Sequence, residues 1–409
     1  MSITAPDYYP KFRCTGTQCE DTCCSGWWNI GVDRNTYARY EQISEPALAP
    51  LFKLALGKDS QPDTRDDSNY GYMRMKPDGG CYFLQADHLC AIHIQLGLSA
   101  LADSCRLYPR YLNRFGNQQE NSLGISCPEA ARLVLLNPQP MQITTIETQA
   151  GIDDKPFRSY SFPLQGEGDP QQIAILNDFR AVLIAILQMR ELSLGARMMM
   201  LGFFLEDASA ILHAEKFAHA SELVPVLENY VGMLAHPVQI EAQFSQINPD
   251  LPYKLKIVAN MLETSLGGRA SPRFLECLQA AQAGLGDAGS AVANYTAAHA
   301  DYYLPFFKDK SYIFENYLVN QMLNRLFPFT RGSFLDLYRE LVFNMSLVRV
   351  LLVGIAGHRR GLDESIVIQT FQTFARNSNH NRGHLDNLLA SLAPGKQDSF
   401  VSVMWMLKE

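Results

Sequence analysis

The chain has 409 residues, of which 47% are hydrophobic and 19% are charged, a globular composition rather than a disordered one. A single core rarely grows beyond about 300 residues, so we expect two or three subdomains. The net charge of −7 argues against a general nucleic-acid binder, which would carry a basic face.

The sequence carries few signs of export. Residues 1–7 lack the basic and apolar segments of a signal peptide. The strongest uncharged apolar run, residues 350–356, is far shorter than the roughly 18 residues of a membrane span. We therefore expect a cytoplasmic protein without a transmembrane segment. In that compartment clustered cysteines bind metal or perform redox chemistry more often than they form disulfides.

The cysteines are the most informative residues, because eight of the nine lie in the first 127 positions. Short spacings let several sulfurs converge at little cost in loop closure, and Gly16 and Gly26 permit the tight backbone that such a loop needs. The clustered residues, all candidate metal ligands, are Cys14, Cys19, Cys23, Cys24, Cys81, Cys90, Cys105 and Cys127.

Three interpretations of these cysteines compete. An iron–sulfur centre takes four thiolates, zinc takes four ligands that include Cys and His, and free cysteines also occur as small buried residues. Eight clustered thiols disfavour the third interpretation. Four of them saturate one site, so eight could fill two sites or leave several in reserve. We expect His88 and His93 to be loop or packing residues, because sulfur is already abundant.

The spacing excludes a standard radical-SAM loop. That superfamily carries C-x3-C-x2-C between a strand and a helix. Cys19 and Cys23 supply the first spacing, but position 26 is Gly26, and no repeated βα pattern follows.

Residues 1–135 are expected to form a cysteine-rich metal-cluster domain with short strands. Residues 30–33 read as a strand, and Asp33 reads as the start of a helix. Residues 57–80 are polar and rich in Gly and Pro, which predicts a loop. Residues 81–135 mix short strand-like and helical pieces, with a short helix at 91–98.

Residues 136–168 read as an extended connector or edge segment, and residues 169–409 as an α-helical domain, which makes the chain mainly α. Asp169 is a plausible N-cap with Pro170 at the first helical position, and apolar residues then recur at helical spacing from Ile173 to Ile186. Similar periodicity predicts helices at 197–214, 221–236, 251–264, 272–283, 289–306, 311–327, 333–353, 363–376 and 382–392.

One motif matches a nucleotide-binding fingerprint in sequence but lacks the structural context of one. Gly284, Gly286 and Gly289 match the G-x-G-x-x-G fingerprint, but they follow a helical pattern rather than a buried strand. We expect a glycine-rich turn between helices there. Met198 to Met200 and the aromatic residues of 302–329 are likewise expected in the core.

Two resemblances then emerge. The Cys-x4-Cys-x3-Cys-Cys run, followed by Cys-x-Phe-Leu, Leu-Cys-x-Ile and Cys-Arg-x-Tyr-Pro, resembles short zinc- or iron-chelating cysteine-cluster proteins. Over nearly the whole chain the sequence resembles the flagellin lysine N-methylase family. The segments that carry this resemblance are DTCCSGWWNI at 21–30, SCPEAAR at 126–132, NYLVNQMLNRLFPF at 316–329 and FARNSNH at 374–380.

The second resemblance implies an S-adenosylmethionine (SAM)-dependent protein-lysine N-methyltransferase that acts on flagellin. It also implies a [4Fe-4S] cluster held by four of the eight clustered cysteines, with zinc as the alternative metal. Cys277 matches no motif, and we expect it to be buried. The resemblance identifies no catalytic or SAM-binding residue. It also does not decide between a radical and a direct transfer of the methyl group.

Lysine attacks a methyl group only as the neutral amine, so the site must lower its pKa or accept a proton. Tyr82, Tyr108, Asp21 and Glu129 lie beside the cysteine motifs and are candidates for this role. A non-enzymatic zinc- or iron-chelating module with a helical partner-binding domain is the alternative function, and an iron–sulfur oxidoreductase is a third.

Overall fold

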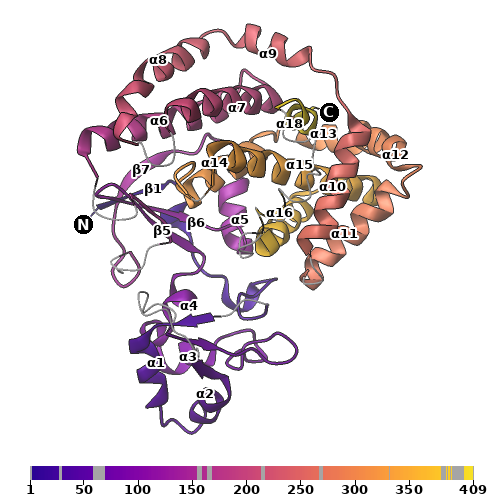
Figure 1. Cartoon of the computed structure of the whole chain (residues 1–409). Helices are drawn as coiled ribbons and strands as arrows, with labels where there is room; N and C mark the ends of the chain where they lie inside the picture. The colour runs from indigo at the N-terminus through magenta and orange to yellow at the C-terminus, as the bar shows by residue number, and fades with distance from the viewer. Residues whose placement is uncertain are drawn as a thin grey trace.

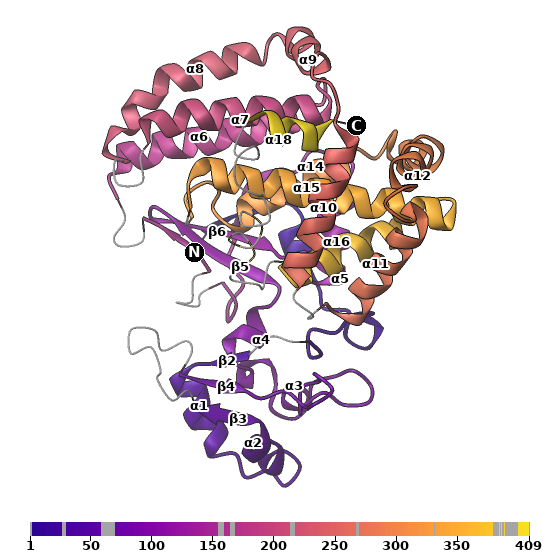
Figure 2. The ribbon, with the colours of Figure 1, turned by 45° about the vertical axis from the view of Figure 1, so that its right-hand side comes forward.

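A computed structural model describes residues 2–26, 30–58, 70–153, 159–163, 168–212, 217–266, 270–330, 332–378, 384, 386, 388 and 400–408. It has a large body and a smaller lobe that hangs below it in both Figure 1 and Figure 2. The lobe holds the shorter helices α1 to α4 and the strands β2 to β4, and the body holds the rest.

The body contains a five-stranded mixed sheet in the order β7-β1-β6-β5-β8. The central hairpin β5–β6 is antiparallel, whereas β1 pairs β6 and β8 pairs β5 in parallel. The strands are β1 (Ser2–Pro6), β5 (Arg110–Phe115), β6 (Gln118–Leu123), β7 (Ile143–Glu147) and β8 (Ser161–Phe162).

The lobe contains a three-stranded antiparallel sheet in the order β2-β4-β3. Asp33 caps α1, and its carboxylate accepts a hydrogen bond from the Thr36 amide at 2.9 Å. The lobe elements are β2 (Ile30–Val32), α1 (Arg34–Glu41), α2 (Ala49–Ala55), β3 (Leu56–Lys58), β4 (Gly71–Met73), α3 (Ala91–Leu96) and α4 (Asp103–Leu107).

Helices make up most of the body. Asp169 caps α6, and Pro170 stands at its first position. The helices are α5 (Pro128–Leu135), α6 (Pro170–Gln188), α7 (Leu194–Ile211), α8 (Val224–Met233), α9 (Pro237–Ser245), α10 (Leu251–Leu266), α11 (Pro272–Leu285), α12 (Ala291–Ala298), α13 (Leu304–Phe307), α14 (Tyr312–Asn324), α15 (Phe334–Arg359), α16 (Glu364–Ser378) and α18 (Phe400–Leu407).

Two large hydrophobic cores divide the chain in the same way, and a third, small cluster consists of Leu107, Leu112 and Ile152. The larger core unites the helices with the inner face of the five-stranded sheet. The smaller core lies in the lobe and includes Val32, Phe52, Phe83 and Cys81. Two cores are what a chain of this length is expected to need.

Helices α6 and α15 are long and apolar enough to cross a membrane by length and composition alone. The apolar stretch of α15 is 89% buried inside the protein, so its composition is explained by its place at the centre of the larger core. The corresponding stretch of α6 is 33% buried, and α6 contacts the sheet through Arg180, which forms an ion pair with Glu120 of β6. One or two such helices are weak support for a membrane span.

The sequence-based expectations for the fold are largely confirmed. The strand at 30–33, the capped helix at Asp33, the short helix at 91–98 and the mainly helical second half are all present. Gly286 ends α11 with a φ of 76°, so the glycine motif is a turn between helices. Met198 to Met200 are buried in the larger core, as are Tyr303, Phe314 and Tyr317.

Some expectations were wrong or fall outside the description. The expected loop at 57–80 begins in β3 and contains β4, whereas 59–69 lie outside the described residues. Residues 136–168, expected as an extended connector or edge segment, do supply the two edge strands of the large sheet, β7 and β8. Most of the helix expected at 382–392 lies outside the described residues, as do positions 27–29 of the motif at 21–30. The domain bounds themselves remain predictions.

Candidate metal centre

The loop that carries the first four cysteines is held against the second cysteine cluster by the backbone. Ser25 forms an antiparallel bridge with Gly80, and the Gly26 amide donates to the Gly79 carbonyl at 3.0 Å. The Cys81 amide donates to the Cys24 carbonyl at 2.8 Å. These pairings bring two cysteines together although 56 residues separate them in the sequence.

Four cysteines surround the smaller core, and we call them the lobe thiol group: Cys24, Cys81, Cys90 and Cys105. A bridge between Leu84 and Cys90 turns the chain back on itself. In α4, the Ser104 hydroxyl donates to the Gly31 carbonyl at 2.7 Å, which fixes α4 and its Cys105 against β2.

Burial makes three thiols of this group less acidic than a free cysteine. Burial raises the pKa of Cys81 to about 11 and also raises the pKa values of Cys90 and Cys105. In each case nearby thiols of the group add a smaller rise, because two neighbouring thiolates repel each other. A metal cation would reverse this, because a coordinating thiol is deprotonated.

The other four cysteines lie where the lobe meets the body, and we call them the junction thiol group: Cys14, Cys19, Cys23 and Cys127. Cys127 packs against the larger core and directly precedes α5. Burial, with smaller contributions from Cys19 and Cys14, raises the pKa of Cys127 to about 12. Cys14 and Cys23 are exposed to solvent, whereas Cys19 and Cys127 are half-buried.

The adjacent residues Cys23 and Cys24 connect the two groups. A hydrogen bond between their thiols raises the pKa of Cys23 and lowers that of Cys24 to about 7. Thr22 and the positive charge of Arg376 also favour the thiolate of Cys24. These contacts favour the thiolate of Cys24 over that of Cys23, and the thiolate is the form that both metal ligation and nucleophilic chemistry require.

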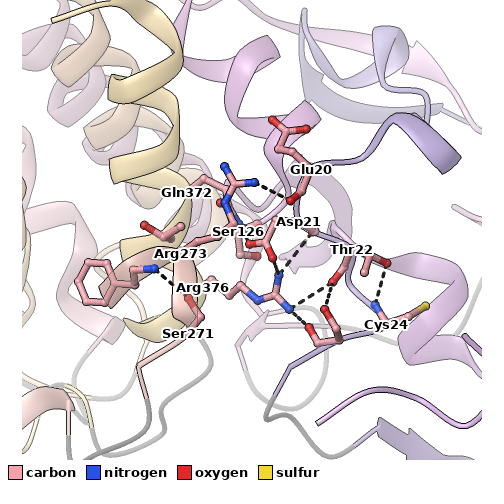
Figure 3. Close-up of polar contacts among 12 residues, drawn as sticks. Glu20, Asp21, Thr22, Cys24, Ser126, Ser271, Arg273, Gln372 and Arg376 are labelled. Atoms are coloured by element: carbon pink, nitrogen blue, oxygen red, sulfur yellow. Dashed lines mark hydrogen bonds and ion pairs between the residues drawn. The ribbon is translucent and has the colours of Figure 1, made fainter. Parts of the chain in front are cut away.

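Arg376 of α16 clamps the cysteine loop onto the body (Figure 3). Its guanidinium forms an ion pair with the Asp21 carboxylate and donates to the carbonyls of Thr22, at 3.2 Å, and Ser25. Gln372, one turn earlier, donates to Asp21 and to the Ser126 carbonyl, each at 2.8 Å. Both partners of the ion pair are largely buried.

A second set of contacts reinforces this clamp. Arg273 of α11 donates to the Glu20 carbonyl, and Arg132 of α5 pairs with the Glu20 carboxylate. A Cβ at Gly26 would stand 2.7 Å from the Arg376 Nη2 atom, so Gly26 leaves the room that the guanidinium needs. The sequence segment FARNSNH includes Arg376, but nothing in the sequence assigns it this role.

The donors suit a soft metal, because all nine cysteines are free and four of them lie in or against the smaller core. Within the described ranges, however, no three His, Cys, Asp or Glu side chains are arranged to hold a metal ion. His88 and His93 are both exposed. Cys277 lies apart in α11, buried, with its sulfur 3.8 Å from the Thr373 hydroxyl, as expected.

The four candidate proton acceptors have definite partners or surroundings. Asp21 is held by Arg376 and Gln372, and Glu129 pairs with Arg132 at 3.0 Å. The Tyr108 hydroxyl lies 3.2 Å from the Ser126 hydroxyl, and burial raises the pKa of Tyr108. Tyr82 packs against the smaller core.

The body also carries a cleft of about 310 Å³ where α6 covers β1 and β6. One lining residue is Glu120, whose carboxylate accepts hydrogen bonds from Arg180 at 2.6 and 2.8 Å. More than half of the lining residues are polar, whereas small-molecule sites are typically apolar with a few placed polar groups. The residues that line it are Thr4, Ala5, Pro6, Gln118, Glu120, Asn121, Ile143, Asn177, Asp178, Arg180, Ala181, Ile184 and Leu323.

Fold and site together define a helical protein with a cysteine-rich lobe clamped to its body. The chain belongs to the FliB lysine N-methylase family, since the model of that family's C-terminal domain matches residues 180–406, more than half of the chain. This confirms the resemblance read from the motifs. The clamp residues Arg376 and Gln372 and the cleft residue Arg180 lie within the matched range.

Curated relatives agree with this placement. Lysine-N-methylases of Salmonella choleraesuis (strain SC-B67) and Salmonella typhimurium (strain LT2) are each 25% identical over 291 residues, 68% of this chain and 66% of the relative. The flagellar biosynthetic protein FliU of Salmonella muenchen is 29% identical over 146 residues, 35% of this chain and 82% of that protein. The chain thus spans somewhat less than two thirds of the two methylases. No solved structure matches it.

Proposed function

We propose that this protein is a cytoplasmic, SAM-dependent protein-lysine N-methyltransferase whose substrate is flagellin. The observation that carries the proposal is the family match over residues 180–406, together with relatives that are named lysine-N-methylases. The flagellar name of a third relative supports flagellin as the substrate.

The reaction requires a neutral amine. The lysine nitrogen forms a bond to the methyl carbon while the carbon–sulfur bond of SAM breaks and its electron pair stays on sulfur. The amine must lose a proton, and its usual pKa is about 10.4. Desolvation against an apolar wall lowers that pKa without a dedicated base.

The two paired carboxylates beside the cysteines are poorly suited to take that proton. Asp21 and Glu129 are each engaged in an ion pair with an arginine, so neither carboxylate is free to meet an incoming lysine. Tyr108 keeps its own proton, because burial raises its pKa well above the usual value. These contacts favour roles in holding the site together.

We assign the metal to the clustered cysteines, as a [4Fe-4S] cluster with zinc as the alternative. Thiolates are the ligands that both prefer, and the free thiols fit a reducing compartment. Such a centre would supply a Lewis-acidic or electron-transferring group beside the junction. Arg376 would fix the loop that carries Cys23 and Cys24 to the helical body.

We place SAM in the cleft between α6 and the sheet. Its apolar residues, among them Ile143 and Ile184, would contact the adenine ring, and the carboxylate of Asp178 suits ribose hydroxyls or the positive sulfonium. Ala181 lines this cleft, so a large side chain at that position would reduce the space available to SAM.

Calorimetric SAM titration of anaerobically purified protein tests this assignment. We expect saturable binding that Ala181→Trp weakens at least about tenfold, or about 1.4 kcal/mol. Val238→Trp is the matched control, because Val238 lies on the surface of α9 and is 81% exposed. Equal SAM affinity in both variants would show that SAM does not bind in this cleft.

The alternative function, a metal-chelating module with a partner-binding body, gains some support from the separate core of the lobe. It predicts metal binding without SAM binding. A protein that holds its full metal complement and shows no saturable SAM binding would favour this alternative over the methyltransferase.

A further inference from the structure

We infer that Cys24 and Cys81 form a reversible disulfide when the lobe holds no metal, so that an oxidant controls whether the metal is loaded. The disulfide itself rests on backbone geometry and packing. Its regulatory meaning rests on the proposed function, in which the clustered cysteines bind the metal. Formation of the bond is measured without any metal or methyl transfer.

The backbone places Cys24 directly opposite Cys81. Ser25 and Gly80 form an antiparallel bridge. One position further along, the Cys81 amide donates to the Cys24 carbonyl at 2.8 Å. In an antiparallel pair, the residues one step from a bridged pair also face each other. Cys24 and Cys81 are therefore cross-strand neighbours.

Packing agrees with this register. Side chains alternate between the two faces of a strand, so Cys24 and Cys81 share the face opposite to that of Ser25. The smaller core contains Cys81, and Cys24 packs against it. Met75, which is bridged to Cys81, packs against the same core. Both cysteine side chains are thus directed to one side of the pairing.

The spacing of such neighbours suits a disulfide. Opposed residues of an antiparallel pair have Cα atoms about 4.5–5.5 Å apart. Disulfides join residues whose Cα atoms are roughly 4.4–6.8 Å apart. A bond between the two sulfurs therefore requires no large movement of the backbone.

The other members of the lobe thiol group are placed differently. Cys90 is bridged to Leu84, and Cys105 lies on α4, which Ser104 fixes against β2. Among the strand and bridge pairings of the described residues, Cys24 and Cys81 are the two cysteines that face each other. The geometry thus selects one pair from the group.

Exposure sets the order in which the two thiols react. Cys24 is half-buried, whereas Cys81 is buried. Susceptibility to oxidation increases with exposure. Hydrogen peroxide therefore oxidises Cys24 first, and Cys81 is the thiol that resolves the product.

The reaction balances with hydrogen peroxide as the oxidant. The sulfur of Cys24 takes one oxygen while the O–O bond breaks, which gives a sulfenic acid and one water. The sulfur of Cys81 then bonds to that of Cys24, and the S–O bond breaks to release a second water. Two electrons pass from the sulfurs to peroxide, and both thiol protons end in water. A dithiol reductant reverses the oxidation by thiol–disulfide exchange.

The disulfide removes two candidate ligands from the metal. A metal binds the thiolate form of cysteine, and a disulfide has no thiolate to offer. The lobe thiol group then retains half of its thiols, whereas zinc and a [4Fe-4S] cluster each take four ligands. Oxidation therefore blocks metal loading, and bound metal protects both thiols from oxidation.

Mass spectrometry of the full chain tests the inference. Metal-free protein is treated with an equimolar amount of hydrogen peroxide, its remaining thiols are alkylated with N-ethylmaleimide, and it is digested with trypsin. We expect a disulfide between the peptides 14–34 and 75–106, which fragmentation assigns to Cys24 and Cys81. Metal-loaded protein should lose this linked pair.

Single variants provide the controls. Cys81→Ser should lose the linked pair. Cys23→Ser should keep it, because Cys23 is adjacent to Cys24 but exposed. Cys90→Ser should also keep it. A linked pair that persists in Cys81→Ser, a bond assigned to Cys23 and Cys24, or no disulfide in the unmodified metal-free chain would overturn the inference.

Metal uptake tests the regulatory part. The oxidised protein should fail to load zinc or iron, and a dithiol reductant should restore loading. Full loading of the oxidised protein would overturn this part. A protein that forms the disulfide and loads metal as expected, yet does not methylate flagellin, would refute the proposed function alone. Methylation by a protein that forms no such disulfide would refute the inference alone.

Discussion

Arg376 is the residue on which the junction depends most. It neutralises Asp21 and satisfies two carbonyls of the cysteine loop. Removing one partner of a buried pair leaves the other charge without compensation, at a cost of about 3–5 kcal/mol. We expect Arg376→Gln to lower the free energy of unfolding by about 3 kcal/mol, measured by urea denaturation.

Lys310→Gln is the matched control for Arg376→Gln. Lys310 pairs with Glu364 on the surface, where the two side chains are 32% and 48% exposed. Exposed pairs contribute about 1 kcal/mol or less. Equal losses in the two variants would show that the Arg376 contacts do not hold the junction.

His384 should make stability depend on pH. It is buried and shares a 2.9 Å hydrogen bond with Asn344, and burial lowers its pKa from the usual 6.5. Below pH 6.5 the unfolded chain therefore binds a proton that the folded chain does not. Stability should fall as the pH falls through this region.

The pH effect is measured as the difference in unfolding free energy between about pH 7.5 and about pH 5.5. His384→Gln keeps a hydrogen-bonding side chain and cannot titrate, so its loss of stability on acidification should be smaller than that of the unmodified protein. The same loss in both proteins would assign the pH dependence to other groups.

At the residue scale, the sequence predicted the candidate metal ligands and two helix caps. It could not predict which side chain holds the cysteine loop against the body. Asp33 and Asp169 were identified as caps because a cap is a local signal. Arg376 was not identified, because the carbonyls that it binds lie 354 and 351 positions earlier in the chain. Only tertiary packing brings these groups together.

At the scale of elements, helices α11 and α15 cross at a contact made by glycines. A Cβ at Gly284 would stand 1.8 Å from the Gly354 carbonyl oxygen and 2.8 Å from the His358 amide nitrogen. This close approach explains why Gly284 lies within a helix, where glycine is otherwise unfavourable. The apparent fingerprint is therefore a packing motif followed by a turn.

Gly284→Ala should destabilise the protein even though alanine is the better helix former. Overpacking costs about 1–3 kcal/mol and occasionally more. Gly232→Ala is the matched control on α8, where no atom lies within 4 Å of the added Cβ, and it should stabilise by about 0.4–1 kcal/mol. Thermal unfolding checks both, and a stabilising Gly284→Ala would contradict the close contact.

The helices that periodicity missed have identifiable reasons. α9 buries only Ile240 and Phe244, too few positions to establish a helical period. α18, with the sequence FVSVMWML, is apolar on nearly all sides, so no polar face reveals its spacing. Long helices with one apolar face, such as α6, were predicted with the correct start.

At the scale of the whole molecule, the two cores predict two responses to metal removal. The lobe thiol group belongs to the smaller core or packs against it, whereas α15 lies within the larger core. Treatment with a chelator should increase hydrogen exchange in the lobe, residues 30–58 and 70–105, and leave α15 protected. Unchanged exchange in the lobe would show that its fold does not need the metal.

The division of the cysteines also belongs to this scale. The sequence predicted that eight thiols gather but could not predict that Cys24 packs against the smaller core whereas the neighbouring Cys23 is exposed. This difference arises from the separate packing of lobe and body.

The central claim is that the clamped cysteine lobe and the helical body together methylate lysine on flagellin. Mass spectrometry of flagellin after incubation with SAM and the anaerobically loaded protein tests it most directly. We predict methyl-lysine with the unmodified protein and none with the variant Cys19→Ser, Cys23→Ser. Unmethylated flagellin with the loaded protein, or full methylation by that variant with no iron bound, would contradict the claim.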